Sequence, residues 1–212
     1  MLMAQAIRRK INKVIKVLVF SDLFLNAGWG LIGPILAIFI IDNIEGGSVE
    51  VAGIAVGIYL LGKSFLQIPI ANYLDINHGE KDDYLAMFLG TILTAITPII
   101  FIFSTMPWHI YTAQIIHALG MAMAVPSWYA IFGRHIAKRR EALCWGLDST
   151  SVGLGAGLSG IIGGFLANYF GFIPLFIGVS VLSFIAAFLF LFIAKDILPK
   201  VPRRGIFPMP KS

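Results

Sequence analysis

Six long apolar runs divide most of the chain and decide what it can fold into. They cover residues 14–41, 51–74, 84–104, 108–132, 142–170 and 172–194. Each run is near or above the roughly 20 residues that an α-helix needs to cross a bilayer. None shows the sustained alternation of apolar and polar residues that is typical of membrane β-strands. The sequence therefore predicts an all-α membrane protein with six transmembrane helices.

The composition agrees with a chain that is mostly embedded in lipid. Hydrophobic residues make up 58% of it and charged residues 13%, about half of the roughly 25% found in soluble domains. The net charge of +5 does not indicate nucleic-acid binding, because the basic residues lie at the ends of the runs rather than in a patch. Cys144, the single cysteine, offers neither a disulfide nor a thiolate metal site.

The basic residues predict which ends of the helices face the cytoplasm. Every Lys and Arg except Lys63 lies near the start of the first run, between the second and third, between the fourth and fifth, or after the sixth. Under the positive-inside rule these segments are cytoplasmic, so both termini are predicted to be inside. We expect a cytoplasmic basic segment at 1–13, a six-helix bundle at 14–198 and a cytoplasmic tail at 199–212, in a multi-pass protein of the cytoplasmic (inner) cell membrane.

Lys63 lies halfway through the second run, where a charge is expensive. It costs roughly 2.5–3.5 kcal/mol on insertion scales, which the surrounding apolar residues can offset at roughly 0.3–0.6 kcal/mol each. The side chain still needs a partner, water or an anion. Tyr59 and Gln67 lie one turn before and one turn after it, on the same helix face. This face is predicted to line a polar path, with Lys63 and Gln67 contacting substrate.

The first run carries Asp22 and, one turn later, Asn26. Asp22 lies about 9 Å beyond Lys16 at the helical rise of about 1.5 Å per residue, within the cytoplasmic leaflet. A carboxyl group buried at this depth can be neutral near pH 7 and can exchange a proton. Asp22 is therefore a candidate proton carrier and Asn26 a candidate substrate contact. The alternative for Asp22 is a structural hydrogen bond to a neighbouring helix.

Two further runs carry polar side chains at depth. In the fourth run, Gln114 and His117 share a face, and a histidine in a membrane helix can titrate or bind substrate. The alternative for His117 is a packing residue. In the fifth run Asp148 is a candidate for the same polar pathway, and the alternative is an ion pair with a basic loop residue such as Arg134.

The polar pattern also distinguishes the helices from one another. The third and sixth runs contain no charged, Asn, Gln or His residue, so we expect them to face lipid. The fifth run contains two small-xxx-small pairs, Gly153 with Gly157 and Gly160 with Gly164. Such pairs allow close helix packing. The alternative is a flexible helix that moves during transport.

The segment from Gly157 to Gly160, read with Ser159, resembles the G-x-S-G motif of rhomboid-type intramembrane serine proteases. That chemistry needs a histidine base within hydrogen-bond reach. The resemblance places this histidine in the last span, and the sixth run has none. We therefore expect no enzyme activity. No zinc-type His/Glu pair, phosphate loop or haem motif occurs either, so no metal or cofactor is expected.

The connection between the second and third runs carries a recognisable pattern. Residues 71–81 read ANYLDINHGEK. This resembles the signature loop of the major facilitator superfamily, G-x-L-a-D-r-x-G-r-r. Asp75 matches the motif aspartate and Gly79 its later glycine, with one extra residue between them, while the first glycine and most arginines are missing. The resemblance implies a gating loop formed by Asp75 and Gly79 together with Arg134.

Two other runs resemble the same family. The segment from Gln114 to Gly120 is similar to its R-x-x-Q-G-x-G motif, with Gln114 in place of the arginine that the family links to proton movement. The glycine-rich fifth run is similar to its antiporter motif, with Leu158 where a proline is expected. The resemblance covers nearly the whole chain. It implies transport by alternating access, with the third and sixth helices outside and the other four lining a cavity.

The usual unit of this family has twelve helices in two similar halves, and the sequence predicts one such half. An even number of spans lets two copies stand parallel as a C2 dimer. We expect a homodimeric, proton-coupled transporter of a small solute, which Lys63 favours as an anion. Two alternatives stay open: the N-terminal half of a longer or heterodimeric transporter, and a non-transporting membrane scaffold or assembly subunit.

Overall fold

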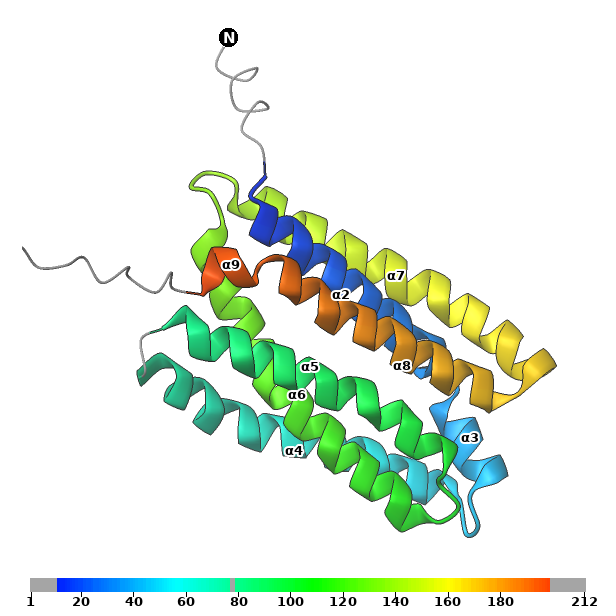
Figure 1. Cartoon of the computed structure of the whole chain (residues 1–212). Helices are drawn as coiled ribbons and strands as arrows, with labels where there is room; N and C mark the ends of the chain where they lie inside the picture. Colours follow the sequence, from blue (N-terminus) through cyan, green and yellow to red (C-terminus); the bar gives the residue numbers. More distant parts are fainter. Residues whose placement is uncertain (1–10, 77–78, 199–212) are drawn as a thin grey trace, which may run out of the picture.

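The computed structural model describes residues 11–76 and 79–198, and this part of the chain is a bundle of helices (Figure 1). In chain order the helices are α2 (Lys13–Ile32), α3 (Leu36–Asn43), α4 (Val49–Ile76), α5 (Glu80–Ile102), α6 (Pro107–His135), α7 (Glu141–Phe170), α8 (Phe172–Leu189), the 3-10 helix η1 (Phe190–Phe192) and α9 (Ala194–Ile197). Six spans are long and apolar enough to cross a membrane: α2, α4, α5, α6, α7 and the joined α8–η1. The predicted six-helix membrane fold is confirmed. The predicted tail 199–212 and most of the predicted segment 1–13 lie outside the described residues.

The first span is shorter than the sequence predicted. Instead of one helix over 14–41, α2 ends at Ile32 and a separate short helix, α3, follows. The break occurs at Gly33 and Pro34. The N–H of Gly33 still bonds to the carbonyl of Trp29 at 2.9 Å, whereas Pro34 has no N–H to donate and its ring clashes with the preceding turn. The chain therefore turns, and α3 packs against α4.

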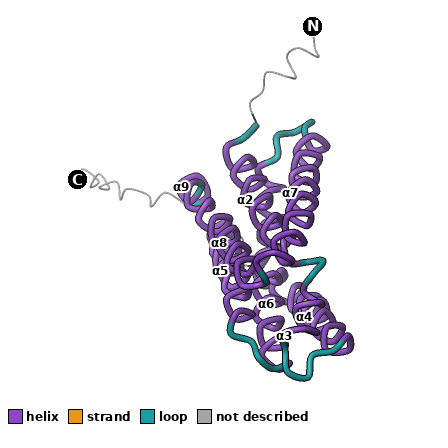
Figure 2. The backbone as a smooth tube through the Cα atoms, turned by 90° about the vertical axis from the view of Figure 1, so that its right-hand side faces the viewer, coloured by secondary structure: helices purple, strands orange, loops and turns teal. Residues whose placement is uncertain are grey.

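The six spans pack as two groups of three. In one group α6 lies between α4 and α5, and in the other α2 lies between α7 and α8. The two groups are joined mainly where α5 packs against α8 (Figure 1). The view turned by 90° shows the same pairs, with α2 beside α7 and α4 beside α6 (Figure 2). As a result α2 and α6 are the central helices, and α4 and α7 lie at the two edges.

Two apolar core clusters close the bundle at its ends. The extracellular cluster includes Phe39, Phe101 and Phe176, with the rings of Phe39 and Phe176 packed edge to face at 4.7 Å. The cytoplasmic cluster includes Phe132 and Phe190. The residues of both clusters come from helices of both groups, so they hold the groups together on either side of the membrane mid-plane.

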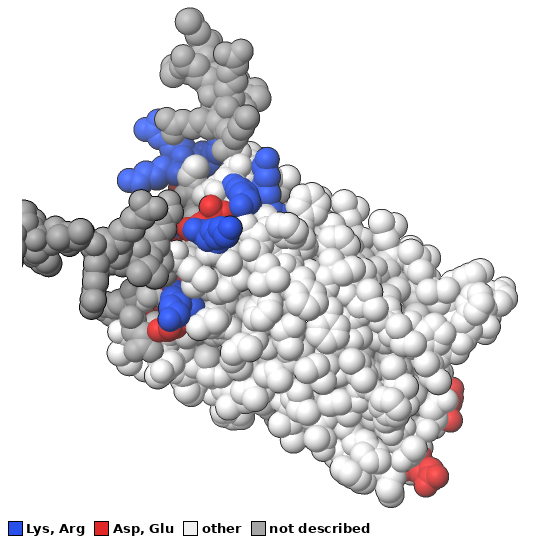
Figure 3. All heavy atoms as spheres, viewed as in Figure 1, with Lys and Arg blue, Asp and Glu red and all other residues white. Residues whose placement is uncertain are grey.

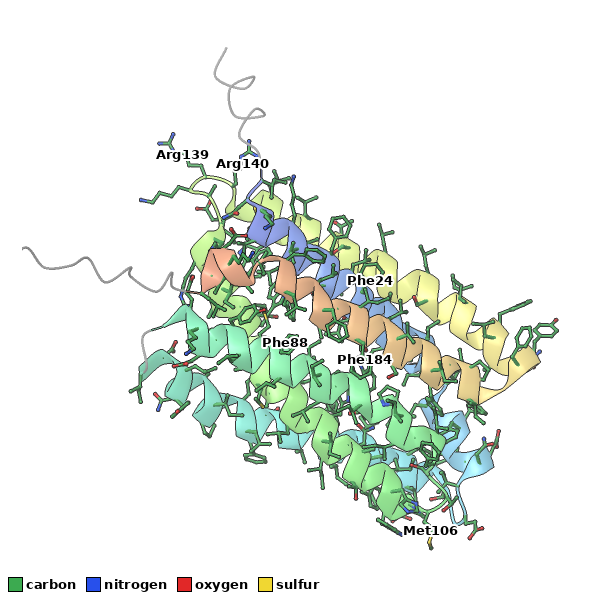
Figure 4. The ribbon with its side chains drawn as sticks, viewed as in Figure 1. Phe24, Phe88, Met106, Arg139, Arg140 and Phe184 are labelled. Atoms are coloured by element: carbon green, nitrogen blue, oxygen red, sulfur yellow. The ribbon has the colours of Figure 1, made fainter. Side chains whose placement is uncertain are left out.

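Charge separates the two ends of the bundle. On the face shown in Figure 3, blue side chains gather at the end where both described chain ends lie, with a few red ones among them, and the charged side chains at the opposite end are red. Figure 4 places Arg139 and Arg140 at the first end and Met106 at the other. Lys13 there bonds to Asp196 at 2.8 Å. Under the positive-inside rule the basic end is cytoplasmic, in agreement with the predicted orientation of both termini.

The third and sixth spans were predicted to face lipid. In the structure only one side of each helix is exposed, and the other side is buried in the bundle. In α5 and α8–η1, 44% of the residues in the most apolar 18-residue stretch are buried, because these helices pack against each other and against α6 and α2. Their other side is apolar and exposed. Phe88 and Phe184 lie on these two helices on the side shown in Figure 4, and Phe24 lies nearby on α2. The least buried spans are the edge helices α4 and α7, at 11% each.

The glycines of α7 serve two different faces. Gly155 and Gly163 pack against the backbone of α2, where an added Cβ at Gly163 would collide with Leu31. At Gly153, Gly157 and Gly164 an added Cβ meets no atom within 4 Å. The closest contacts with α2 therefore use Gly155 and Gly163, and of the two predicted small-xxx-small pairs only Gly160 lies against this region, 3.6 Å from the carbonyl of Gly30 once a Cβ is added.

We expect Gly163→Val to destabilise the bundle by about 1–3 kcal/mol, the usual cost of overpacking a well-packed site. Thermal unfolding of the detergent-solubilised protein measures this effect. Gly133→Val on α6 is the control, because an added Cβ there meets nothing within 4 Å. Equal losses in the two variants would mean that helix propensity, not the α2–α7 contact, is being measured.

Candidate functional site

A cavity of about 720 Å³ opens between α2, α4, α6 and α7, the four helices predicted to carry polar groups at depth. No residue of α5 or α8 lines it. Its wall is formed by Asp22, Leu25, Asn26, Trp29, Tyr59, Lys63, His117, Met121, Val125, Tyr129, Trp145, Asp148, Ser149 and Val152. Because most of these lie well inside their helices, the cavity reaches the middle of the membrane.

Helical spacing explains which side chains reach the cavity. On α2 the lining residues follow i, i+3, i+4 and i+7 from Asp22 to Trp29, and on α7 they follow the same spacing from Trp145 to Val152. On α6 they recur every fourth residue from His117 to Tyr129. Both spacings keep side chains on one face of a helix. Each helix therefore turns one narrow stripe towards the cavity.

Two carboxyl groups face the cavity from different helices. Asp22 accepts a hydrogen bond from Nδ2 of Asn26 at 3.0 Å, and the same amide bonds to the backbone carbonyl of Asp22 at 2.8 Å. Asp148 lies near enough for its charge to interact with that of Asp22. Its Oδ1 is buried and has no hydrogen-bond partner among the described residues. Like charges in one site disfavour each other, and the cavity places these two carboxyl groups on one wall.

His117 lies in a three-ring stack that joins three helices. Its imidazole is 3.7 Å from the ring of Trp29 and 4.3 Å from that of Tyr59, with interplanar angles of 8° and 15°. The side chain is only 6% exposed, and its Nδ1 has no partner among the described residues. Lys63 is close enough to interact with it electrostatically. His117 therefore lines the cavity and also packs α2, α4 and α6 together.

A second aromatic cluster lies between the cavity and the cytoplasmic end. Trp145 of α7 packs against Phe132 and Tyr129 of α6, with ring centroids 4.6 and 5.9 Å away. Trp128 stacks on Phe132 at 4.5 Å. Tyr129 and Trp145 also line the cavity. The cluster therefore forms part of the cavity wall on α6 and α7.

The predicted gating residues lie at the cytoplasmic end, apart from the cavity. Asp75 is in the last turn of α4, Gly79 is the N-cap of α5, and Arg134 is in the last turn of α6. Arg134 forms an ion pair with the buried Asp83. The alternative pairing of Asp148 with Arg134 is therefore not the one that the structure shows. Sequence reasoning missed Asp83, although the acidic first turn of α5 was a visible signal.

The cavity brings together five of the predicted pathway residues and leaves out two. Asp22, Asn26, Lys63, His117 and Asp148 all line it, listed above by helix. The two residues that do not line it are Gln67, which is half-buried further along α4, and Gln114, which is almost fully buried. Gln67 and Gln114 each lie about one turn from a lining residue, so not every position on a polar helix face reaches the cavity.

Sequence reasoning also missed two polar lining residues, Tyr129 and Ser149. Tyr129 continues the face of His117 and Met121 by two further turns, and Ser149 is adjacent to Asp148. Extending each polar stripe along its helix would have found Tyr129. Nothing in the local sequence distinguishes Ser149 from the other small polar residues of α7.

The six-helix bundle with a charged cavity at membrane depth defines the class of protein: a polytopic membrane protein with an internal polar cavity. The chain matches the family model of the Major Facilitator Superfamily over residues 18–208, and it belongs to that superfamily. The family resemblance found in the sequence is confirmed.

Curated relatives of the chain are twice its length. It is 27% identical over 195 residues to the multi-drug resistance efflux pump PmrA of Streptococcus pneumoniae, both in serotype 4 (strain ATCC BAA-334 / TIGR4) and in strain ATCC BAA-255 / R6. In each case the match covers 88% of this chain and 46% of the pump. The chain thus spans about half the length of the curated relatives it matches.

Proposed function

We propose that this chain is one half of a secondary active transporter that moves a small molecule across the cytoplasmic membrane by alternating access. The observation that carries the proposal is the cavity, which brings Asp22, Lys63 and Asp148 together at membrane depth from three helices. Ionisable residues inside membrane spans are costly and usually mark substrate or proton pathways. The relatives' description as efflux pumps makes outward movement of a small molecule the first activity to test.

Within this proposal the two ends of the cavity have different tasks. Asp22, with Asp148 beside it, takes up and releases the coupling proton. Lys63 and Asn26 contact the substrate, and Lys63 favours one with an anionic group. The rings of Tyr129 and Trp145 offer apolar faces to the rest of the molecule. The substrate class is thus a small, partly aromatic molecule with an acidic group.

The experiment is transport by purified protein in proteoliposomes with an imposed pH difference. A panel of fluorescent aromatic compounds, with and without a carboxylate, is loaded on one side. We expect pH-driven movement of at least one acidic member, and collapse of that movement when a protonophore removes the pH difference. A panel with no protonophore-sensitive movement, from protein shown to be folded and dimeric, would contradict the proposal.

We further propose that a second copy of the chain covers the cavity. The cavity is lined in part by the edge helices α4 and α7, which are the least buried spans. Gly153, Gly157 and Gly164 recur at spacings of four and seven on α7, and an added Cβ at each meets nothing within 4 Å. Such a stripe accepts a closely packed helix. In a C2 dimer with its axis along the membrane normal, α4 of one copy faces α7 of the other.

We expect disulfide cross-linking between copies when Leu60 and Gly157 are both replaced by Cys in a Cys144→Ala background. Both residues are open to the surroundings, and they lie about 17 and about 20 Å from the extracellular ends of α4 and α7 at about 1.5 Å per residue. Non-reducing electrophoresis of membranes treated with a mild oxidant detects the covalent dimer.

Ile177→Cys on the exposed side of α8 is the matched control and is expected to stay monomeric. Native mass spectrometry in nanodiscs gives an independent measurement. A particle of twice the chain mass of 23.2 kDa supports the dimer. A stable monomer in the nanodisc, together with no cross-link from the Leu60 and Gly157 pair, would overturn it.

A further inference from the structure

A second, smaller chamber of about 80 Å³ lies beside the cavity, inside the bundle. It shares six lining residues with the cavity, Asp22 and Asp148 among them, and its other walls include Met87 and Thr91 of α5 and Trp128 of α6. The cavity has no wall from α5. The two carboxyl residues therefore lie where the cavity and the chamber adjoin, and the α5 wall is on the chamber side.

Two polar atoms of residues that line the chamber have no hydrogen-bond partner among the described residues: Oδ1 of Asp148 and Nε1 of Trp128. Both side chains are more than nine-tenths buried, with 9% and 8% of their residue surfaces exposed. Buried polar atoms without protein partners are ordinarily satisfied by ordered water. Here one atom can only accept a hydrogen bond when ionised and the other can only donate one.

Water matches this chemistry better than a cation does. One water molecule can donate to a carboxylate and accept from an indole N–H, whereas an indole N–H cannot ligate a cation. Thr91 donates its hydroxyl to the carbonyl of Met87 at 2.8 Å, and Ser21 donates to that of Ala186 at 2.9 Å. Their oxygens can still accept from water. At about 30 Å³ per molecule, the chamber has room for about two or three waters.

We propose that this chamber is a hydration site that holds ordered water between Asp22, Asp148 and Trp128. The proposal rests on the proposed transport function and adds a compartment to it. A substrate that fills the cavity displaces the water on one side of the carboxyl pair. The chamber keeps water on the other side, so the pair can hold or give up its proton while substrate is bound. Met87, Trp128 and Phe190, which line the chamber, also belong to the apolar cytoplasmic cluster.

The experiment is X-ray hydroxyl-radical footprinting of the purified protein in nanodiscs, read out by mass spectrometry. Bound water next to a buried side chain is a local source of radicals, so Met87 is expected to be oxidised although it is fully buried. Ala124→Leu fills the chamber with apolar bulk and is expected to lower oxidation of Met87 about tenfold. Ser149→Leu adds bulk to the cavity alone and is expected to leave it unchanged. Met123, which lines neither compartment, is the reference within the same molecule.

A second variant keeps the test valid if Ala124→Leu does not fold. Trp128→Phe removes the indole N–H without adding volume, and it is expected to lower Met87 oxidation at least twofold. If Met87 is oxidised as little in the wild type as in Ala124→Leu, the chamber holds no ordered water and the proposal is overturned. This readout does not depend on transport. If Met87 is oxidised but no pH-driven transport is found, the hydration site is supported and the proposed function is overturned. If Met87 is protected and transport is found, the function is supported and the hydration site is overturned.

Discussion

Asp22→Asn is expected to abolish proton-driven accumulation while leaving the fold and substrate binding intact. Asn is close to Asp in shape and can still accept the hydrogen bond that Asn26 donates to Asp22 Oδ1, but it cannot take up a proton. A difference of one pH unit is worth about 1.4 kcal/mol per proton. A transporter that couples one proton to one substrate can therefore sustain a concentration ratio of about tenfold per pH unit, and the variant is expected to reach a ratio of about one.

The measurement is the steady-state substrate ratio across proteoliposomes at several imposed pH differences. Asp42→Asn is the control, because Asp42 lies exposed near the extracellular end, outside the cavity. Downhill movement of substrate without a pH difference should survive in the Asp22 variant. Unchanged pH-driven accumulation in Asp22→Asn would rule out Asp22 as the carrier, and the same experiment on Asp148→Asn would then test the other member of the pair.

The fold could be predicted from the sequence because bilayer length, hydropathy and loop charge each constrain it independently. The six spans and the basic end were visible in residue types alone. The break at Pro34 was also visible, and the predicted span ran through it only because Leu36 to Ile41 continue the apolar run. The contact face of α7 could not be predicted, because a helix with many glycines offers several small-residue stripes, and tertiary packing alone selects Gly155 and Gly163 for α2.

The residues of the candidate site, like the fold, could be predicted from the sequence only in part. Asp22, Lys63 and Asp148 could be named from the sequence because an ionisable residue inside a membrane span is costly and usually has a function. Gln67 and Gln114 were named by spacing from these residues, and the structure turns them away from the cavity. The partner of Arg134 lies on another helix, so the acidic first turn of α5 was visible in the sequence but not which of its carboxylates Arg134 binds. The inner chamber depends on α5, a helix without any charged residue beyond its first turns, and it was invisible in the sequence.

Lys63→Gln is expected to remove the preference for an acidic substrate, with a loss of about 10- to 100-fold in affinity for the acid. The structure assigns Lys63 no ion-pair partner among the described residues, so its charge is available to a ligand. A hydrogen bond to a charged group is worth about 1.5–3 kcal/mol, which corresponds to this range at about 1.4 kcal/mol per tenfold. Removing the charge also relieves an insertion cost of roughly 2.5–3.5 kcal/mol, so the variant should fold at least as well as the wild type.

The sharpest measurement compares one aromatic acid with its neutral amide in the same binding assay on nanodisc-held protein. The wild type should bind the acid more tightly, and Lys63→Gln should bind the two about equally, because only the acid uses the charge. Lys16→Gln, at the cytoplasmic end of α2 and outside the cavity, is the matched control and should keep the wild-type preference. If the wild type binds the amide as tightly as the acid, Lys63 does not select an anion. In that case the charge of Lys63 would serve to balance the carboxyl groups of Asp22 and Asp148. These two carboxyl groups, and not Lys63, would then determine which substrates bind.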